Sequence, residues 1–176
     1  IPETQSFAVS PVFENNICAL SNNPRMREQP EYHDLERLVD HELGHALIDQ
    51  VSRRTGNGMW PDIPNFQELP FDAKIGINII SEGIGGYFEG TSLRRRDNYT
   101  DEVFPESFAD LSWRYRDAVD LFIREGGRWI VTPIIAYYGE QGLMYLVTHP
   151  LRFENGNLRA AARLYRETAL TDLSRR

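Results

Sequence analysis

Two histidines lie four residues apart in the segment His41–His45, which reads H-E-L-G-H. The surrounding residues, from about Asp34 to Arg54, repeat their apolar positions every three or four residues and therefore predict a helix. On a helix, positions i and i+4 lie above one another on the same face, so both imidazoles can reach one metal ion. Glu42 lies about 100° round the helix from His41, close enough to contact a water on that ion. We therefore predict that His41 and His45 are metal ligands and that Glu42 is a catalytic acid/base.

A third ligand must come from elsewhere, because a catalytic zinc site has three protein ligands and an open position for water. One common zinc-peptidase pattern has its third histidine six residues after the second, but Val51 stands there. Di-iron bundles use paired E-x-x-H motifs, whereas this chain has one, Glu42–His45. Cys18 lacks the E-G-C-L-S context of the zinc-ligating cysteine in peptide deformylases. The first two patterns are excluded, and the third is disfavoured.

Glu82 is the remaining candidate for the third ligand. It lies among isoleucines in the segment 71–88, which is predicted to be helical, and a carboxylate in apolar surroundings is costly unless it is paired or bound to a metal. Gly83, Gly85 and Gly86 follow it, and each glycine costs about 1 kcal/mol in a helix interior relative to alanine. Close approach of two helix backbones would explain these glycines and would let Glu82 reach the metal. The alternative is a glycine-rich helix end with a solvated Glu82.

The remaining pattern predicts a mainly α (α+β) chain that folds as one compact domain over residues 1–176. Residues 1–33 hold short β-like pieces between prolines and asparagines, so we expect a small β hairpin or extended arm there. Residues 34–176 are expected to be helical. The expected helices are 34–54, 71–88, 106–124, 132–147 with bends at Gly139 and Gly142, and 157–168, with loops over 59–70 and 90–105.

Composition narrows the classes of function. The chain has 176 residues, of which 41% are hydrophobic, and a formal net charge of −7. The size and apolar content fit one globular domain, and the acidic balance argues against broad nucleic-acid binding. No apolar run reaches the ~18 residues of a membrane-spanning helix. One cysteine allows no internal disulfide, and the start at Ile1 suggests that an upstream segment has been removed, so the compartment stays open.

The motif at His41–His45, followed on the next helix by Glu82, resembles the gluzincin metallopeptidases, the thermolysin-like clan. The context of Glu82, S-E-G-I-G-G-Y-F, is similar to an E-G-x-A-x-Y-F element of small, minimal gluzincin domains, with Gly85 where that element usually has alanine. The order and spacing of the two motifs extend the resemblance over residues 41–88. It implies a zincin-like fold with a helical lower half and often a β-sheet above the cleft. It also implies Zn²⁺ as cofactor and a peptide or protein as substrate.

With zinc on these three ligands, Glu42 would take a proton from the attacking water and deliver it to the leaving amine. The resemblance also implies a Tyr or His that donates a hydrogen bond to the oxyanion, as is usual in these enzymes. Tyr137, Tyr138 and His149 are our candidates for that donor, with ordinary core packing or helix capping as the alternative for each. Asp49, one helical turn beyond His45, is a candidate for orienting a ligand histidine.

A different function remains open from the sequence. The same metal site could belong to a catalytically silent or latent zinc-binding module with a regulatory or interaction role. Glu42 argues for the enzyme, because a structural zinc needs a fourth protein ligand and no general base. The sequence does not specify the cleavage preference or the oligomeric state.

Overall fold

The computed structural model describes residues 35–55, 68–90, 100–110, 116–153 and 156–175. These residues are mainly helical, and none of them lies in a strand, which confirms the expectation of a mainly α chain. The expected β or extended arm, residues 1–33, lies outside the described residues. The helices are α2 (Leu35–Thr55), α3 (Phe71–Phe88), α5 (Arg116–Thr148) and α6 (Leu158–Ser174), with two short 3-10 helices, η3 (Asp101–Val103) and η4 (Phe108–Asp110).

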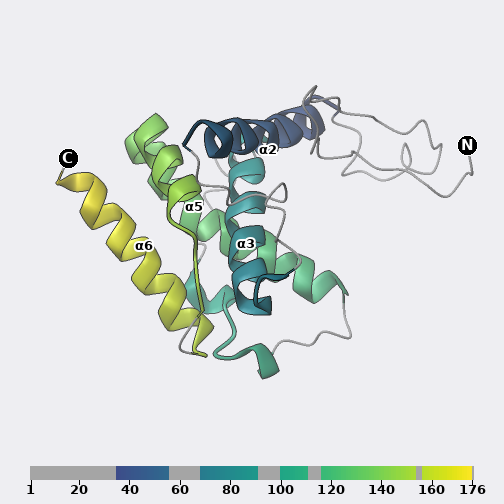
Figure 1. Ribbon diagram of the computed structural model, residues 1–176. Coiled ribbons are helices and arrows are strands. Elements are labelled where there is room, and N and C mark those ends of the chain that lie inside the picture. Colours follow the sequence, from purple (N-terminus) through teal and green to yellow (C-terminus); the bar gives the residue numbers. More distant parts are fainter. Residues whose placement is uncertain (1–34, 56–67, 91–99, 111–115, 154–155, 176) are drawn as a thin grey trace, which may run out of the picture.

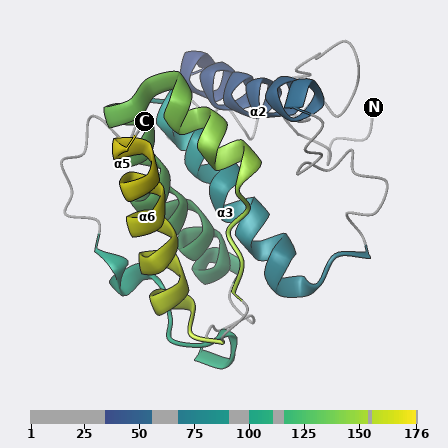
Figure 2. The same cartoon turned by 60° about the vertical axis from the view of Figure 1, so that its left-hand side comes forward.

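Helix α3 is the centre of the described fold (Figures 1 and 2). It makes its most extensive contact with α5 and its next most extensive with α2, which lies across one end of it. Helix α6 packs against α5 on the side away from α2. The helix that carries both histidines and the helix that carries Glu82 are therefore direct neighbours.

The sequence of α3 explains its central position. Isoleucines occupy two sides of this helix rather than one narrow stripe, and so broad an apolar surface is stable only when it packs against neighbouring helices. Its isoleucines at positions 75, 77, 79, 80 and 84 are at most 6% exposed. They form one continuous core with Ile48 of α2 and with apolar residues of α5 and α6.

Glycines allow α3 and α5 to come into backbone contact. A Cβ on Gly127 of α5 would lie 2.3 Å from the carbonyl oxygen of Ile79, and a Cβ on Gly83 of α3 would lie 2.6 Å from that of Gly127. Such distances are closer than any real Cβ allows, so larger residues at these positions would push the two helices apart.

The prediction of separate helices over 106–124 and 132–147 is wrong. Of the first segment, the part at Phe108–Asp110 forms only η4, and α5 then runs from Arg116 to Thr148 without a break near residue 127. Gly126 and Gly127 are packing sites rather than helix ends. A Cβ on Gly126 would lie 2.8 Å from the ring of Phe104, which is fully buried.

The predicted bend is confirmed at Gly139 and wrong at Gly142. Gly139 has φ 53° and ψ −127°, outside the helical region, so α5 consists of two helical parts joined at this residue. Gly142 stays helical, and its missing side chain gives room to the carbonyl of Ile134, 2.5 Å from where a Cβ would lie. Helix α6 begins as predicted, because Asn157 caps it by accepting a hydrogen bond from the backbone N–H of Ala160.

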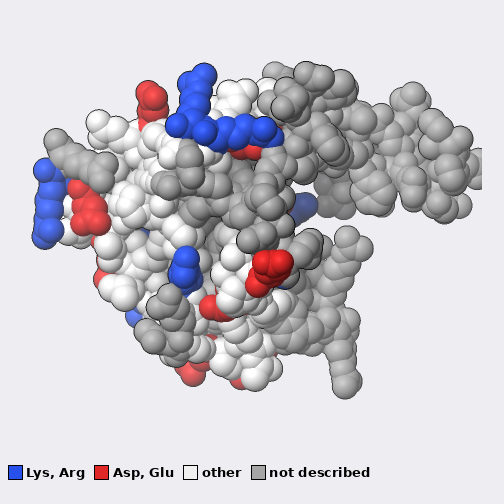
Figure 3. All heavy atoms as spheres, viewed as in Figure 1, with Lys and Arg blue, Asp and Glu red and all other residues white. Residues whose placement is uncertain are grey.

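Two whole-chain expectations can be compared with the described residues. None of the helices that the structure describes is both long and apolar enough to span a membrane. On the face seen in Figure 3, the described basic side chains lie among acidic ones and form no broad basic patch there.

Candidate metal centre

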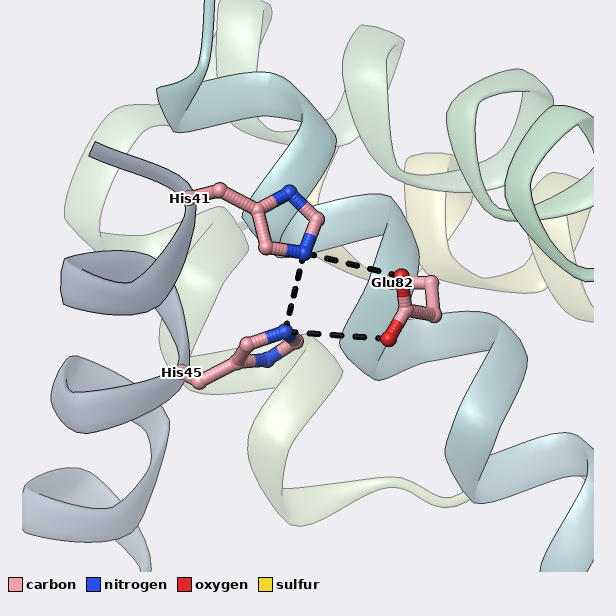
Figure 4. Close-up of side chains that lie close together, drawn as sticks. All are labelled: His41, His45 and Glu82. Atoms are coloured by element: carbon pink, nitrogen blue, oxygen red, sulfur yellow. Dashed lines mark hydrogen bonds and ion pairs between the residues drawn. The ribbon is translucent and has the colours of Figure 1, made fainter. Parts of the chain in front are cut away.

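Helix α2 presents His41 and His45 to α3 on the same face, as the four-residue spacing predicted. Figure 4 shows both rings pointing toward the carboxylate of Glu82, which comes from α3. The two Nε2 atoms are 3.1 Å apart. The Nε2 of His41 is 3.5 Å from Oε2 of Glu82, and the Nε2 of His45 is 3.7 Å from Oε1. The prediction that Glu82 lies beside the two histidines is confirmed.

These three side chains form what we call the His–His–Glu triad, a group that could hold a metal ion. Ligand atoms 2.0–2.1 Å from a tetrahedral zinc are about 3.3–3.4 Å apart. The two Nε2 atoms are 3.1 Å apart, and they lie 3.5 and 3.7 Å from different oxygens of Glu82. One ligand atom from each of the three residues lies within 4.8 Å of the other two. Small rotations of the three side chains would therefore bring all of them onto one ion.

The outer nitrogen of each ring has its own partner. The Nδ1 of His45 is 2.9 Å from Oγ of Ser81, and the Nδ1 of His41 is 3.4 Å from a carboxylate oxygen of Glu89. A neutral histidine that binds a metal through Nε2 carries its proton on Nδ1, so Ser81 and Glu89 would accept hydrogen bonds from the two ligands. Such partners fix the orientation and tautomer of the rings.

Glycines bring the two helices together at the triad, as the sequence predicted. A Cβ on Gly85 would lie 2.8 Å from Cε1 and Nε2 of His41. A Cβ on Gly44 of α2 would lie 3.0 Å from Cα of Gly85. The ring of His41 therefore occupies the space that a side chain at position 85 would take.

The charges at the triad are strongly coupled in the metal-free protein. Burial lowers the pKa of His41, but the attraction of Glu82 and Glu89 outweighs it and raises that pKa to about 9. Burial and the nearby His41 lower the pKa of His45 to about 4. Burial would raise the pKa of Glu82, but the two histidines and Arg124 lower it. At neutral pH the triad thus carries one proton on His41, held by two carboxylates.

Glu42 lies on the core side of α2 and is 7% exposed. Its Oε2 has no hydrogen-bond partner among the described residues. Burial raises the pKa of this carboxyl, His41 lowers it and Glu82 raises it again, so Glu42 senses the charges of the triad. A buried carboxylate with an unpartnered oxygen and an electrostatic interaction with the triad is a candidate functional group.

The three candidates for the oxyanion donor have other surroundings. Tyr137 is 80% exposed. The hydroxyl of Tyr138 donates to the backbone carbonyl of Leu170 in α6, at 3.2 Å. The ring of His149 stacks on Tyr145 at the end of α5. None of these contacts involves the triad, and they give no support to an oxyanion role.

Asp49 also has a partner other than a ligand histidine. Both of its carboxylate oxygens accept from Nε of Arg53, at 3.1 and 3.0 Å, and Ser81 occupies the position beside Nδ1 of His45. The expectation that Asp49 orients a ligand histidine therefore gains no support.

Sequence reasoning missed three residues around the triad, namely Ser81, Glu89 and Arg124. Glu89 could have been found, because it lies seven residues after Glu82 and therefore on the same face of α3. The only sequence signal for Ser81 is its position next to Glu82. No local sequence pattern indicates Arg124, because it lies on another helix, α5. Its Nε is 3.9 Å from Oε2 of Glu82.

Comparison of the chain with protein-family models, with curated proteins and with solved structures gives no match.

Proposed function

We propose that the chain is a zinc-dependent hydrolase of peptide bonds, related to the gluzincins. The observation that carries this proposal is the His–His–Glu triad itself, in which one possible ligand atom from each residue lies within 4.8 Å of the others across two helices. Two imidazoles and one carboxylate are the ligands of a well-known class of catalytic zinc site, in which three protein ligands leave one position open. His41, His45 and Glu82 would hold the ion, with Ser81 and Glu89 behind the two rings.

When bound, zinc supplies a Lewis acid that polarises a carbonyl and lowers the pKa of water towards about 7. The proton transfers belong to Glu42. Its carboxylate accepts a proton from the attacking water and returns it to the nitrogen of the leaving amine. The raised pKa of Glu42 suits both steps, because a base that must later act as an acid works best when its pKa is near the working pH.

The test separates metal binding from turnover. Zinc content is measured by atomic emission on purified protein, and cleavage is followed by mass spectrometry on a pool of short synthetic peptides. Glu42→Gln should keep about one zinc per chain and lose activity about 10²- to 10⁴-fold, because the amide cannot accept the proton. His41→Ala and Glu82→Ala should lose both zinc and activity.

The matched control is Glu140→Gln, which makes the same change at an exposed position of α5 and should alter neither zinc content nor turnover. Full activity in Glu42→Gln would contradict the mechanism. Full zinc content in Glu82→Ala would remove the third ligand. Stoichiometric zinc with no turnover of any peptide by the wild-type protein would favour the silent or latent zinc-binding module instead.

A further inference from the structure

Helix α5 places a cation beside the candidate metal centre. The Nε of Arg124 lies 3.9 Å from Oε2 of Glu82, the oxygen that also faces His41. Arg124 also contributes to lowering the pKa of Glu82 and of Glu89. Its guanidinium is thus an immediate neighbour of the triad, although it comes from a part of the chain about forty residues further on.

Arg124 and Arg128 lie one helical turn apart on α5 and differ in their surroundings. The side chain of Arg128 is 14% exposed, and it donates to Glu125 at 2.8 Å. It also covers Gly86, since its Nε is 3.3 Å from where a Cβ on that residue would lie. Arg128 is therefore held in place by the fold.

The side chain of Arg124 is 62% exposed, whereas those of His41 and His45 are 14% and 11% exposed. Its distance of 3.9 Å from Glu82 exceeds hydrogen-bonding range. Ion pairs of such exposed side chains contribute little to stability. The position of Arg124 is therefore not explained by the stability of the fold, and its planar group stays accessible beside the triad.

The charges around the triad suggest how Arg124 could act on a substrate. Glu42, Glu82 and Glu89 are three carboxylates that interact electrostatically with His41, and a bound zinc ion would offset only two of their three negative charges. An exposed guanidinium next to them adds a positive charge that can attract an anionic group of the substrate. Its fork of N–H groups also matches a carboxylate in two parallel hydrogen bonds, which a lysine cannot provide.

We propose that Arg124 is a substrate-binding residue that takes a carboxylate of the peptide next to the bond that is cleaved. The inference rests on the proposed function and specifies its substrate class as peptides that carry an anionic group at this place. Two sources offer the same chemistry, the free carboxylate at the end of a peptide and the side chain of an internal Asp or Glu.

The experiment uses the zinc-loaded full chain and one pool of short neutral peptides made in three forms. The forms have a free C-terminal carboxylate, an amidated C-terminus, or an amidated C-terminus with one added Asp. Rates of cleavage are measured by mass spectrometry for the wild type, Arg124→Ala and Arg124→Lys. The control is Arg53→Ala, which removes the same charge from an arginine paired with Asp49 on α2.

The wild type should cleave one of the two carboxylate-bearing forms about tenfold faster than the amidated form, or more. Faster cleavage of the free-end form assigns the C-terminal carboxylate, and faster cleavage of the Asp form assigns the side chain. Arg124→Ala should bring the ratio of the rates close to one, and Arg124→Lys should restore it only in part. Arg53→Ala should leave the ratio unchanged.

Three results would overturn the inference. The first is a wild type that cleaves all three forms equally, which leaves the proposed peptidase activity intact. The second is an Arg124→Ala variant that keeps the preference. The third is an Arg124→Ala variant that loses zinc, because Arg124 would then act through Glu82 and not on the substrate. Absence of cleavage of every form by the wild type would instead reject the proposed function together with the inference.

Discussion

Gly85 has no side chain, and the ring of His41 lies in the space that a side chain there would fill. We expect Gly85→Ala to displace this ring, because the new Cβ would lie 2.8 Å from two of its atoms. Zinc affinity, measured by competition with a chromophoric chelator, should fall about 10- to 100-fold, the usual effect of disturbing the support of a ligand.

Gly86→Ala is the control for this change on the same helix. Its Cβ would meet only the side chain of Arg128, at 3.3 Å, and not the triad. Zinc affinity should therefore stay within a few-fold of the wild type in Gly86→Ala. Equal losses in both variants would show that any methyl group on this part of α3 disturbs the site.

Protons should compete with zinc at His41. The pKa of His41 is about 9 in the metal-free protein and that of His45 is about 4. Between these values His41 is protonated and His45 is neutral, so binding through His41 must release one proton. A rise in pH removes the competing proton and therefore strengthens zinc binding. Affinity should rise about tenfold per pH unit around pH 7 and level off above pH 9.

Isothermal titration calorimetry in buffers of different ionisation enthalpy measures this release. About one proton per zinc is the expected value at neutral pH, and Glu89→Gln should reduce it, because Glu89 helps to hold the proton on His41. Binding with no net release of protons would contradict a protonated His41 in the metal-free protein.

The centre of the site could be predicted at this scale because spacing alone determines it. The local sequence is enough to predict two histidines on adjacent helical turns and a carboxylate among isoleucines as ligands. Ser81 and Arg124 could not be found in this way, since their contacts depend on how three helices pack. For Tyr137, Tyr138 and His149 the sequence offers only the residue type, which does not specify where a helix points its side chains.

Among the helices, the crossing of α3 and α5 determines the position of Glu82, whose side chain is 31% exposed. Gly127→Ala should destabilise the protein although alanine favours helix formation by about 1 kcal/mol. The new Cβ would lie 2.3 Å from the carbonyl of Ile79. We expect the free energy of unfolding, measured with urea, to fall by about 1–3 kcal/mol.

Gln141→Ala, at an exposed position of the same helix, should change the free energy of unfolding by less than about 0.5 kcal/mol. If Gly127→Ala were as stable as Gln141→Ala, the close contact of the two backbones would be wrong.

The same crossing explains why the sequence predicts the bounds of α2 and α3 correctly but not those of α5. The bounds of α2 and α3 follow from their periodicity and flanking residues, and they match the structure within a residue. The pair at Gly126 and Gly127 is typical of a helix end, yet α5 continues through it, because Phe104 and the backbone of α3 fill the space that side chains would take. Local sequence does not distinguish a glycine that ends a helix from one that serves packing.

At the scale of the whole molecule, a bound metal would join α2 to α3 and thus to the rest of the core. A ligand that binds only the folded state stabilises it by about 4 kcal/mol at a thousandfold excess over Kd. For a chain of this size that corresponds to a rise in Tm of roughly 8–16 °C. Calorimetry with and without zinc should detect the rise, and a chelator should reverse it. The same rise in Glu82→Ala would place the binding elsewhere.

One zinc ion should bind between α2 and α3. Anomalous diffraction from crystals of the zinc-loaded protein, recorded on both sides of the zinc absorption edge, would locate the ion. We expect a single strong peak about 2.0–2.1 Å from Nε2 of His41, from Nε2 of His45 and from a carboxylate oxygen of Glu82. A zinc peak bound by other side chains, or a peak at the two histidines with Glu82 turned away from it, would show that the three residues do not form one zinc site.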